Sequence, residues 1–348
     1  MEKKIQYLKI IVFKKNIMKR IILSLLIILL YGITDKMYAQ SEEIWFAIKD
    51  GIDNQNLKAT LENNTTLFLT ACNKTIINKE KPDFSSKIIA KNSLKKLLSF
   101  WETTPFYCTK MYISEKCLKK TSGGFQIRNI PVCMPDAPED SRNQEIVINF
   151  TNTGLIDDIA ISVNETRYRE ILNDYSTIED LGRREIIVDF IENFRTSYNI
   201  KDINYIESVF SEQALIITGK VVKIAQIKDA AVNKLLGDEK ITYVLQSKAE
   251  YIKNLKQTFL RNKYIDIQFN DIEVVKHPKN DFLYGVTLKQ LWGSSTYNDS
   301  GYIFLLIDFK YEQQPMIHVR TWQPDSFNGK PLSKNEIFNF GNFNIQNL

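Results

Sequence analysis

The chain has 348 residues, of which 44% are hydrophobic and 25% charged, and a formal net charge of +5. Residues 1–39 hold eight Lys or Arg and two Asp or Glu, so the rest carries 38 basic against 39 acidic residues, a net charge of −1. Nucleic-acid binding requires a surplus of positive charge on one face. Composition shows no such surplus, so a nucleic-acid partner is not expected.

The amino terminus has the layout of a secretory signal. Met18-Lys19-Arg20 begins a basic stretch, an apolar run covers residues 21–30, and a more polar segment ends at Tyr38-Ala39-Gln40. A membrane-spanning helix needs about 20 apolar residues, and this run is interrupted from Gly32 onward. We therefore predict a signal peptide with an upstream extension over residues 1–39 and a periplasmic or secreted protein that meets the membrane only before cleavage. An uncleaved anchor is the alternative.

The remaining chain is longer than the roughly 250–300 residues at which a single core stops growing. The sequence therefore predicts two domains. An α+β domain is expected over residues 40–165, a connecting segment over 166–182, and a second domain over 183–348.

In the first half, helical spacing precedes strand-like runs. Apolar residues recur every three or four positions from Leu57 to Cys72 and again from Leu94 to Trp101, which predicts two helices. Asn152-Thr153-Gly154 is a hairpin signal between the last two of the strands that follow. The expected strands are Phe106–Met111, Ile113–Leu118, Phe125–Met134, Glu145–Thr151 and Leu155–Val163.

The second half repeats this order. Ile186 to Tyr198 present one apolar helical face, and Asp202 caps a shorter helix that carries Ile206 and Val209. A strand follows over Ala214–Val222, and Ser247 with Glu250 has the spacing of a capping box for a third helix. Four more strands are expected at Tyr264–Val275, Leu283–Trp292, Tyr302–Lys310 and Met316–Trp322.

Four cysteines remain after the signal, in a compartment that permits disulfides. Cys108 and Cys117 lie on consecutive strand-like runs, so a hairpin would bring them opposite one another as a candidate disulfide. Buried free thiols are the alternative, also for Cys72 and Cys133. No C-x-x-C pair occurs and both histidines are distant in sequence, so neither a metal site nor a cofactor is expected.

Residues 183–323 resemble the nuclear transport factor 2-like (NTF2-like) superfamily, and in particular its secreted bacterial members of unassigned function. The resemblance rests on the element order and on Phe190-Ile191-Glu192-Asn193-Phe194, Lys201-Asp202, Ile206-Glu207-Ser208-Val209-Phe210-Ser211 and Ile216-Ile217-Thr218-Gly219. It implies a cone, in which a curved antiparallel sheet wraps around helices and leaves a cavity. The similar order in the first half leaves a diverged second copy open.

Residue parity suggests where a site could lie, because successive side chains of a strand point to opposite faces. The odd-numbered residues of the last strands look like a plain core. The even-numbered residues mix aromatic and polar groups, and with a turn at Glu312–Gln314, Asp308 lies opposite His318 or Arg320. The predicted even face comprises Tyr284, Gln290, Trp292, Tyr302, Phe304, Asp308, His318, Arg320 and Trp322.

Two functions fit this face. The first is a non-catalytic exported protein that binds a small molecule, glycan or protein partner, with Tyr284, Gln290, Trp292, Tyr302, Arg320 and Trp322 as ligand-binding candidates. The second is an enzyme of hydrolase, lyase or isomerase type, in which Asp308 orients His318 for general acid/base work. A cross-strand Asp–His pair is also an ordinary structural tie, and aromatic sheet faces also form dimer interfaces, which leaves a homodimer open.

Overall fold

The structure, a computed structural model, describes residues 42–173, 178, 180–223 and 239–343. The predicted signal peptide therefore lies outside the described residues. Within the described segments, no helix is both long and apolar enough to cross a membrane. Residues 43–348 form one compact unit by their contacts, so the division into two domains is not confirmed.

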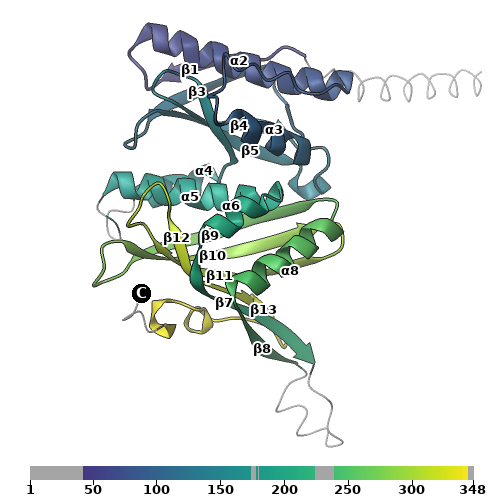
Figure 1. Cartoon of the computed structure of the whole chain (residues 1–348), viewed down its shortest axis with the longest axis vertical. Coiled ribbons are helices and arrows are strands. Elements are labelled where there is room, and N and C mark those ends of the chain that lie inside the picture. Colours follow the sequence, from purple (N-terminus) through teal and green to yellow (C-terminus); the bar gives the residue numbers. More distant parts are fainter. Residues whose placement is uncertain (1–41, 174–177, 179, 224–238, 344–348) are drawn as a thin grey trace, which may run out of the picture. The chain divides into compact units, whose positions relative to one another are not determined.

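The chain is a mixture of helices and sheets, as predicted (Figure 1). In the first half, the strands form a sheet in the order β1-β3-β4-β5-β6, in which β1 pairs with β3 in parallel and β2 adds to β4. The elements of this half are β1 (Trp45–Asp50), α2 (Gln55–Asn78), α3 (Leu94–Thr103), β2 (Tyr107–Cys108), β3 (Tyr112–Lys119), β4 (Phe125–Cys133), a 3-10 turn at Glu139–Ser141, β5 (Asn143–Phe150) and β6 (Ile156–Ile161).

The second half forms a six-stranded sheet in the order β8-β7-β12-β11-β10-β9. Strand β9 pairs with β10, β10 with β11, and β11 with β12, and all three pairs are antiparallel. Strands β7 and β8 are also antiparallel, whereas β12 and β7 run parallel. Its elements are α4 (Glu165–Asn173), α5 (Leu181–Asn199), α6 (Ile203–Ser208), β7 (Phe210–Lys223), β8 (Glu239–Gln246), α8 (Lys248–Arg261), β9 (Ile265–Lys276), β10 (Leu283–Ser294), β11 (Asn298–Asp308), β12 (Met316–Pro324), the small strands β13 (Ser326–Phe327) and β14 (Lys330–Pro331), and 3-10 turns at Lys334–Glu336 and Phe340–Asn342.

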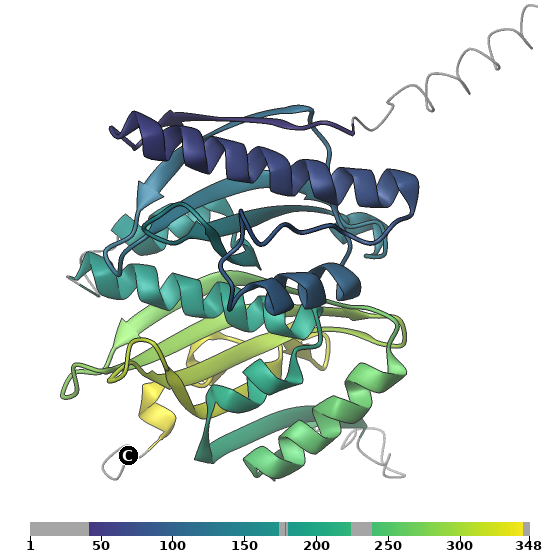
Figure 2. The ribbon, with the colours of Figure 1, turned by 45° about the horizontal axis from the view of Figure 1, so that its top comes forward.

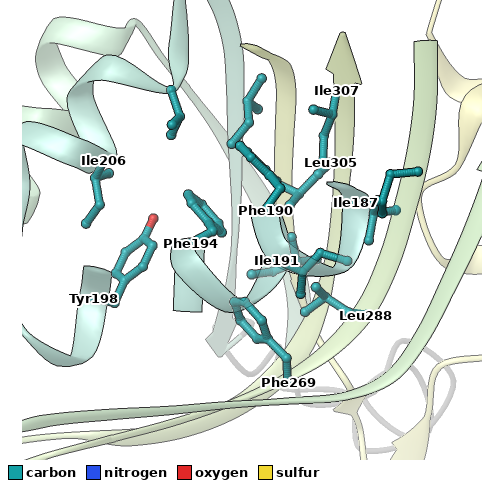
Figure 3. Close-up of a cluster of buried hydrophobic side chains, with 14 of the residues drawn as sticks. Ile187, Phe190, Ile191, Phe194, Tyr198, Ile206, Phe269, Leu288, Leu305 and Ile307 are labelled. Carbon is teal, nitrogen blue, oxygen red and sulfur yellow. The ribbon is translucent and has the colours of Figure 1, made fainter. Parts of the chain in front are cut away.

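Helix α5 lies between the two sheets and contacts β6 on one side and β9 on the other (Figures 1 and 2). Its apolar side packs on the second sheet: Phe190, Phe194 and Tyr198 lie beside Leu305 and other sheet residues in one core cluster (Figure 3). Burying such aromatic side chains is worth about 1.5–3 kcal/mol each. This burial therefore stabilises the packing of the second sheet against α5.

The opposite side of α5 is polar and buried. Arg128 of β4 donates from Nη1 and Nη2 to Glu192 of α5, at 3.0 and 2.5 Å, and these side chains are 4% and 1% exposed. Arg195 of α5 donates to the carbonyl oxygens of Ser162, the residue after β6, and Ile267 of β9, at 2.9 and 2.6 Å. The two halves are thus joined through hydrogen-bonded charges.

The candidate disulfide between Cys108 and Cys117 is wrong, since all four cysteines are free. Cys108 on β2 faces Val132 of β4, and Cys117 on β3 faces Ile127 of β4, so both pair with β4 rather than with each other. Burial raises the pKa of the Cys117 thiol to about 11 and that of Cys108 to about 12. The alternative of buried free thiols describes these two residues.

The first half does not repeat the strand order of the second. Strand β1 joins the first sheet beside β3, the first long strand of its meander. Strand β7 joins the second sheet beside β12, the last strand of its meander. A diverged second copy therefore finds no support in the strand order.

Candidate functional site

A cavity of about 810 Å³ opens between α8 and the inner face of the second sheet. Helix α8 begins at a capping box in which the Ser247 hydroxyl and the Glu250 carboxylate bond to each other's backbone N–H, as predicted. From that fixed start, side chains at helical spacing face the cavity. These are Tyr251, Asn254, Leu255, Thr258, Arg261 and Asn262.

The sheet wall of the cavity includes residues of β7, β8, β10, β11 and β12. Strand β10 contributes Gln290 and Trp292, and β12 contributes Arg320 and Trp322. Between them, Gly301 of β11 leaves room for the indole of Trp322, because a Cβ at this position would lie 2.7 Å from that ring and 2.3 Å from the Gln323 carbonyl oxygen. The missing side chain at position 301 thus shapes the wall beneath Trp322.

Arg320 is the buried cation of this wall. It is 5% exposed, its Nε has no hydrogen-bond partner among the described residues, and it forms no ion pair with any of them. Its guanidinium carbon lies 5.1 Å from the centre of the Tyr251 ring, and the hydroxyl of Tyr251 is 2.5 Å from that of Tyr198. A buried charge without a counter-ion is costly, and stacking on aromatic faces offsets only part of that cost.

Two further polar groups of the wall lack partners. Gln290 is 4% exposed, and its side-chain amide makes no hydrogen bond within the described part of the chain. Asp299, which lies opposite Trp292 on β11, has a buried Oδ1 with no partner among the same residues. Native structures leave few buried polar atoms unsatisfied. Among the described residues, two of the six such atoms, Arg320 Nε and Asp299 Oδ1, belong to this cavity, and a ligand or ordered water there would complete their bonding.

The carboxyl group of Asp299 has a raised pKa. Burial raises it above the usual 3.8, and the Tyr297 hydroxyl and the charge of Arg320 counteract that rise only in part. In turn, burial and the neighbouring Asp299 raise the pKa of Tyr297 to about 12. Ionised Asp299 is therefore a destabilising group.

We expect Asp299→Asn to be more stable than the wild type at pH 7. Because the folded pKa is higher than the unfolded one, the folded wild type binds more protons than the unfolded chain between the two values, and it loses stability as pH rises through that window. The asparagine variant lacks this loss, so the difference should disappear below about pH 4, where both states of the wild type are protonated. Urea unfolding at pH 3.5, 5 and 7 measures it. A variant less stable than the wild type at pH 7 would contradict the destabilising role.

The predicted even face is split between the two sides of the sheet. In both hairpins of β10, β11 and β12, even-numbered residues pair with odd-numbered ones: Trp292 lies opposite Asp299, and Ile303 lies opposite Trp322. Paired residues share a face, so parity reverses at each strand. The inner side therefore holds Tyr284, Gln290, Trp292, Arg320 and Trp322 with the odd residues of β11, whereas Tyr302, Phe304 and Asp308 belong to the outer side.

A β-bulge at His318 separates the predicted catalytic pair from Arg320. The register shifts there, so that Asp308 pairs with Met316 whereas Arg320 pairs with Leu305. The expected proximity of Asp308 and His318 is found, with Oδ2 and Nε2 3.7 Å apart. Neither residue lines the cavity. The prediction that all three share a face is wrong, because one extra residue in a strand reverses every side chain beyond it.

The outer sheet face is covered by the chain's own carboxyl-terminal segment. Phe338, Phe340 and Phe343 pack on Leu283, Phe304, Leu306 and Val319. Phe340 lies so close to Gly285 that a Cβ there would be 2.7 Å from its ring. The aromatic sheet face proposed as a binding surface is thus occupied at Phe304.

No protein-family model matches the sequence, and no curated protein matches it. Solved structures similar to the chain include Bd1075 of Bdellovibrio bacteriovorus, with 13% identity over 61% of this chain and 75% of that one and a TM-score of 0.32. They also include a putative scytalone dehydratase of Novosphingobium aromaticivorans (10% identity, 42% and 86% covered, TM-score 0.31) and an NTF2-like protein of unknown function from Shewanella oneidensis (13%, 40% and 98%, TM-score 0.28). NTF2-like folds thus occur among the neighbours, at low TM-scores and over part of the chain.

The structure also shows residues that the parity argument missed. Asp299, Gly301, Tyr251 and Thr258 all line or shape the cavity, and only the helical spacing of the last two could have indicated a shared face. In the described ranges, no group of three or more His, Cys, Asp or Glu side chains is arranged to hold a metal ion. The residues that line the cavity do not indicate a particular cofactor.

Proposed function

We propose that this protein is an exported, non-catalytic binding protein that takes a small molecule into the cavity between α8 and the second sheet. The observation that carries the proposal is Arg320, a buried cation with an unpaired Nε in the wall of an 810 Å³ cavity. Cavities of about 300–1,000 Å³ that combine apolar walls with a few convergent polar groups are typical ligand sites. The NTF2-like resemblance of residues 183–323 supports a hollow cone of this kind.

A catalytic role based on Asp308 and His318 is less well supported. That pair lies outside the cavity lining and on the far side of the bulge from Arg320. Such a pair ties neighbouring strands together, which is a sufficient structural role for it.

Blocking the cavity tests the proposed binding without altering its charges. Thr258 on α8 lines the cavity, whereas the adjacent Gln257 is exposed and does not. A metabolite library is screened by thermal shift against the wild type, Thr258→Trp and the matched control Gln257→Trp. A ligand at 100 times its Kd stabilises the folded state by about 2.7 kcal/mol, and we expect Thr258→Trp to lose that stabilisation and Gln257→Trp to keep it. Stabilisation unaffected by Thr258→Trp, or a library without a single binder, would refute the proposal.

A further inference from the structure

The charges that line the cavity are unevenly compensated. Asp325 has its own partners, Lys289 Nζ at 3.0 Å and the Ser300 hydroxyl at 2.8 Å. Lys220 and Arg261 are exposed to solvent. Arg320, by contrast, is deeply buried and forms no ion pair with any described residue, although Asp299 in the same wall is close enough to affect its pKa.

The partner that Arg320 lacks is an anion. A guanidinium presents several N–H donors in a planar fork that matches a carboxylate at two points. Since burial of Arg320 already removes its hydration, a ligand that brings a negative charge would offset the cost of that burial.

The surroundings restrict the charge and shape of that anion. Asp299 belongs to the same wall and is close enough to Arg320 for the two to affect each other's pKa. A doubly charged group such as a phosphate would therefore lie beside an acidic residue, and Arg320 would be the one buried cation that balances the negative charges. A singly charged carboxylate brings half that negative charge and so reduces the imbalance. Trp292 and Trp322 offer flat apolar surfaces, and the free amide of Gln290 offers both a donor and an acceptor.

We infer that the ligand is a small ring-bearing monocarboxylic acid, whose carboxylate pairs with Arg320 and whose ring lies against Trp292 or Trp322. This inference rests on the proposed function and specifies its ligand class. An aromatic acid and a uronic acid share the chemistry that it requires, because aromatic side chains pack against both kinds of ring and Gln290 can bond to a hydroxyl of either.

Matched acid and amide probes test the charge directly. Binding of 2-naphthylacetate and D-glucuronate to the wild type is measured by calorimetry and ligand-observed NMR, beside 2-naphthylacetamide and D-glucuronamide. A hydrogen bond to a charged group contributes about 1.5–3 kcal/mol, so the amide should bind about 10- to 100-fold more weakly than its acid. The acid that binds more tightly identifies the kind of ring.

Two variants locate the effect. Arg320→Gln should weaken the acid by the same about 10- to 100-fold and leave the amide nearly unchanged. Lys253→Gln, an exposed cation of α8 that does not line the cavity, should change either affinity by less than about threefold, because exposed charges are screened by water and salt.

The acid-to-amide comparison uses wild-type protein, so it holds even where Arg320→Gln fails to fold. Equal affinity for acid and amide, or no binding of either acid at about 10 mM, overturns the carboxylate inference. Neutral or cationic ligands that Thr258→Trp excludes would then still support the cavity as a binding site, which keeps the two failures distinguishable.

Discussion

Glu192→Leu is expected to lower the free energy of unfolding by about 3–5 kcal/mol, because it leaves the buried guanidinium of Arg128 without its counter-charge. Arg128 Nη1 also bonds to Gln126 Oε1 at 3.1 Å, and Glu192 Oε1 also accepts from the Val163 backbone N–H at 2.7 Å. The residual bond to Gln126 cannot neutralise the charge. Urea unfolding followed by circular dichroism measures the loss.

The double variant Arg128→Met with Glu192→Leu separates the ion pair from its burial. Removing both charges should restore most of the stability lost in the single variants, since well-packed apolar replacements of buried ion pairs are often neutral. Glu207→Leu serves as control: Glu207 pairs with Lys256 at 3.4 Å on the surface, with side chains 46% and 50% exposed, and should cost less than about 1 kcal/mol. A single variant as mild as this control would show that the buried pair does not join the two halves.

This ion pair also bears on the domain prediction. Chain length favoured two domains. Length alone, however, does not show whether the two apolar cores are separated by a linker or joined by a shared element. In the structure, one face of α5 packs in the core of the second half, while its other face bonds to β4 through Arg128 and to the backbone of β6 through Thr196, whose hydroxyl accepts from the Ile161 N–H at 2.9 Å. Apolar periodicity identified the first face of α5. The burial of the polar face was not predicted, because a buried charge and an exposed one look alike in a sequence.

Elements with strong local signals were predicted well. The capping box at Ser247 and the apolar face of α5 are found where they were expected. Strand β1 was missed although Ile44, Phe46 and Ile48 are buried at period two, because the strand is short and pairs in parallel with β3 across the intervening helices. Its register depends on tertiary contacts that no local pattern reports.

The candidate site was predicted in part. Parity within one strand grouped Gln290 with Trp292 and Arg320 with Trp322, and all four line the cavity. Parity between strands failed, because it depends on the length of each turn and on the bulge at His318. A period of two specifies which residues of a strand share a face, but the pairing register decides which face of its neighbour they join.

Ending the chain at Glu336 is the change we expect to have the second-largest effect, a loss of about 2–5 kcal/mol. The deletion removes Phe338, Phe340 and Phe343, each partly buried on the outer face of the second sheet, and such partial burial contributes about 0.7–1.5 kcal/mol for each ring. It also removes the Phe338 N–H that donates to Gln323 Oε1 at 2.8 Å. A chain ending at Phe343 keeps all of these contacts and is the control.

The same deletion addresses self-association. It uncovers Leu283, Phe304, Leu306 and Val319, which form a contiguous apolar face, and contiguous apolar patches on a sheet favour association. Light scattering should therefore show a larger oligomer for the chain that ends at Glu336 than for the chain that ends at Phe343. A shortened chain that keeps both its stability and its oligomeric state would show that the aromatic segment does not cover this face in solution. A homodimer formed through this face requires the segment to be displaced, whereas one formed elsewhere does not, so the comparison also tests whether a homodimer could use this face.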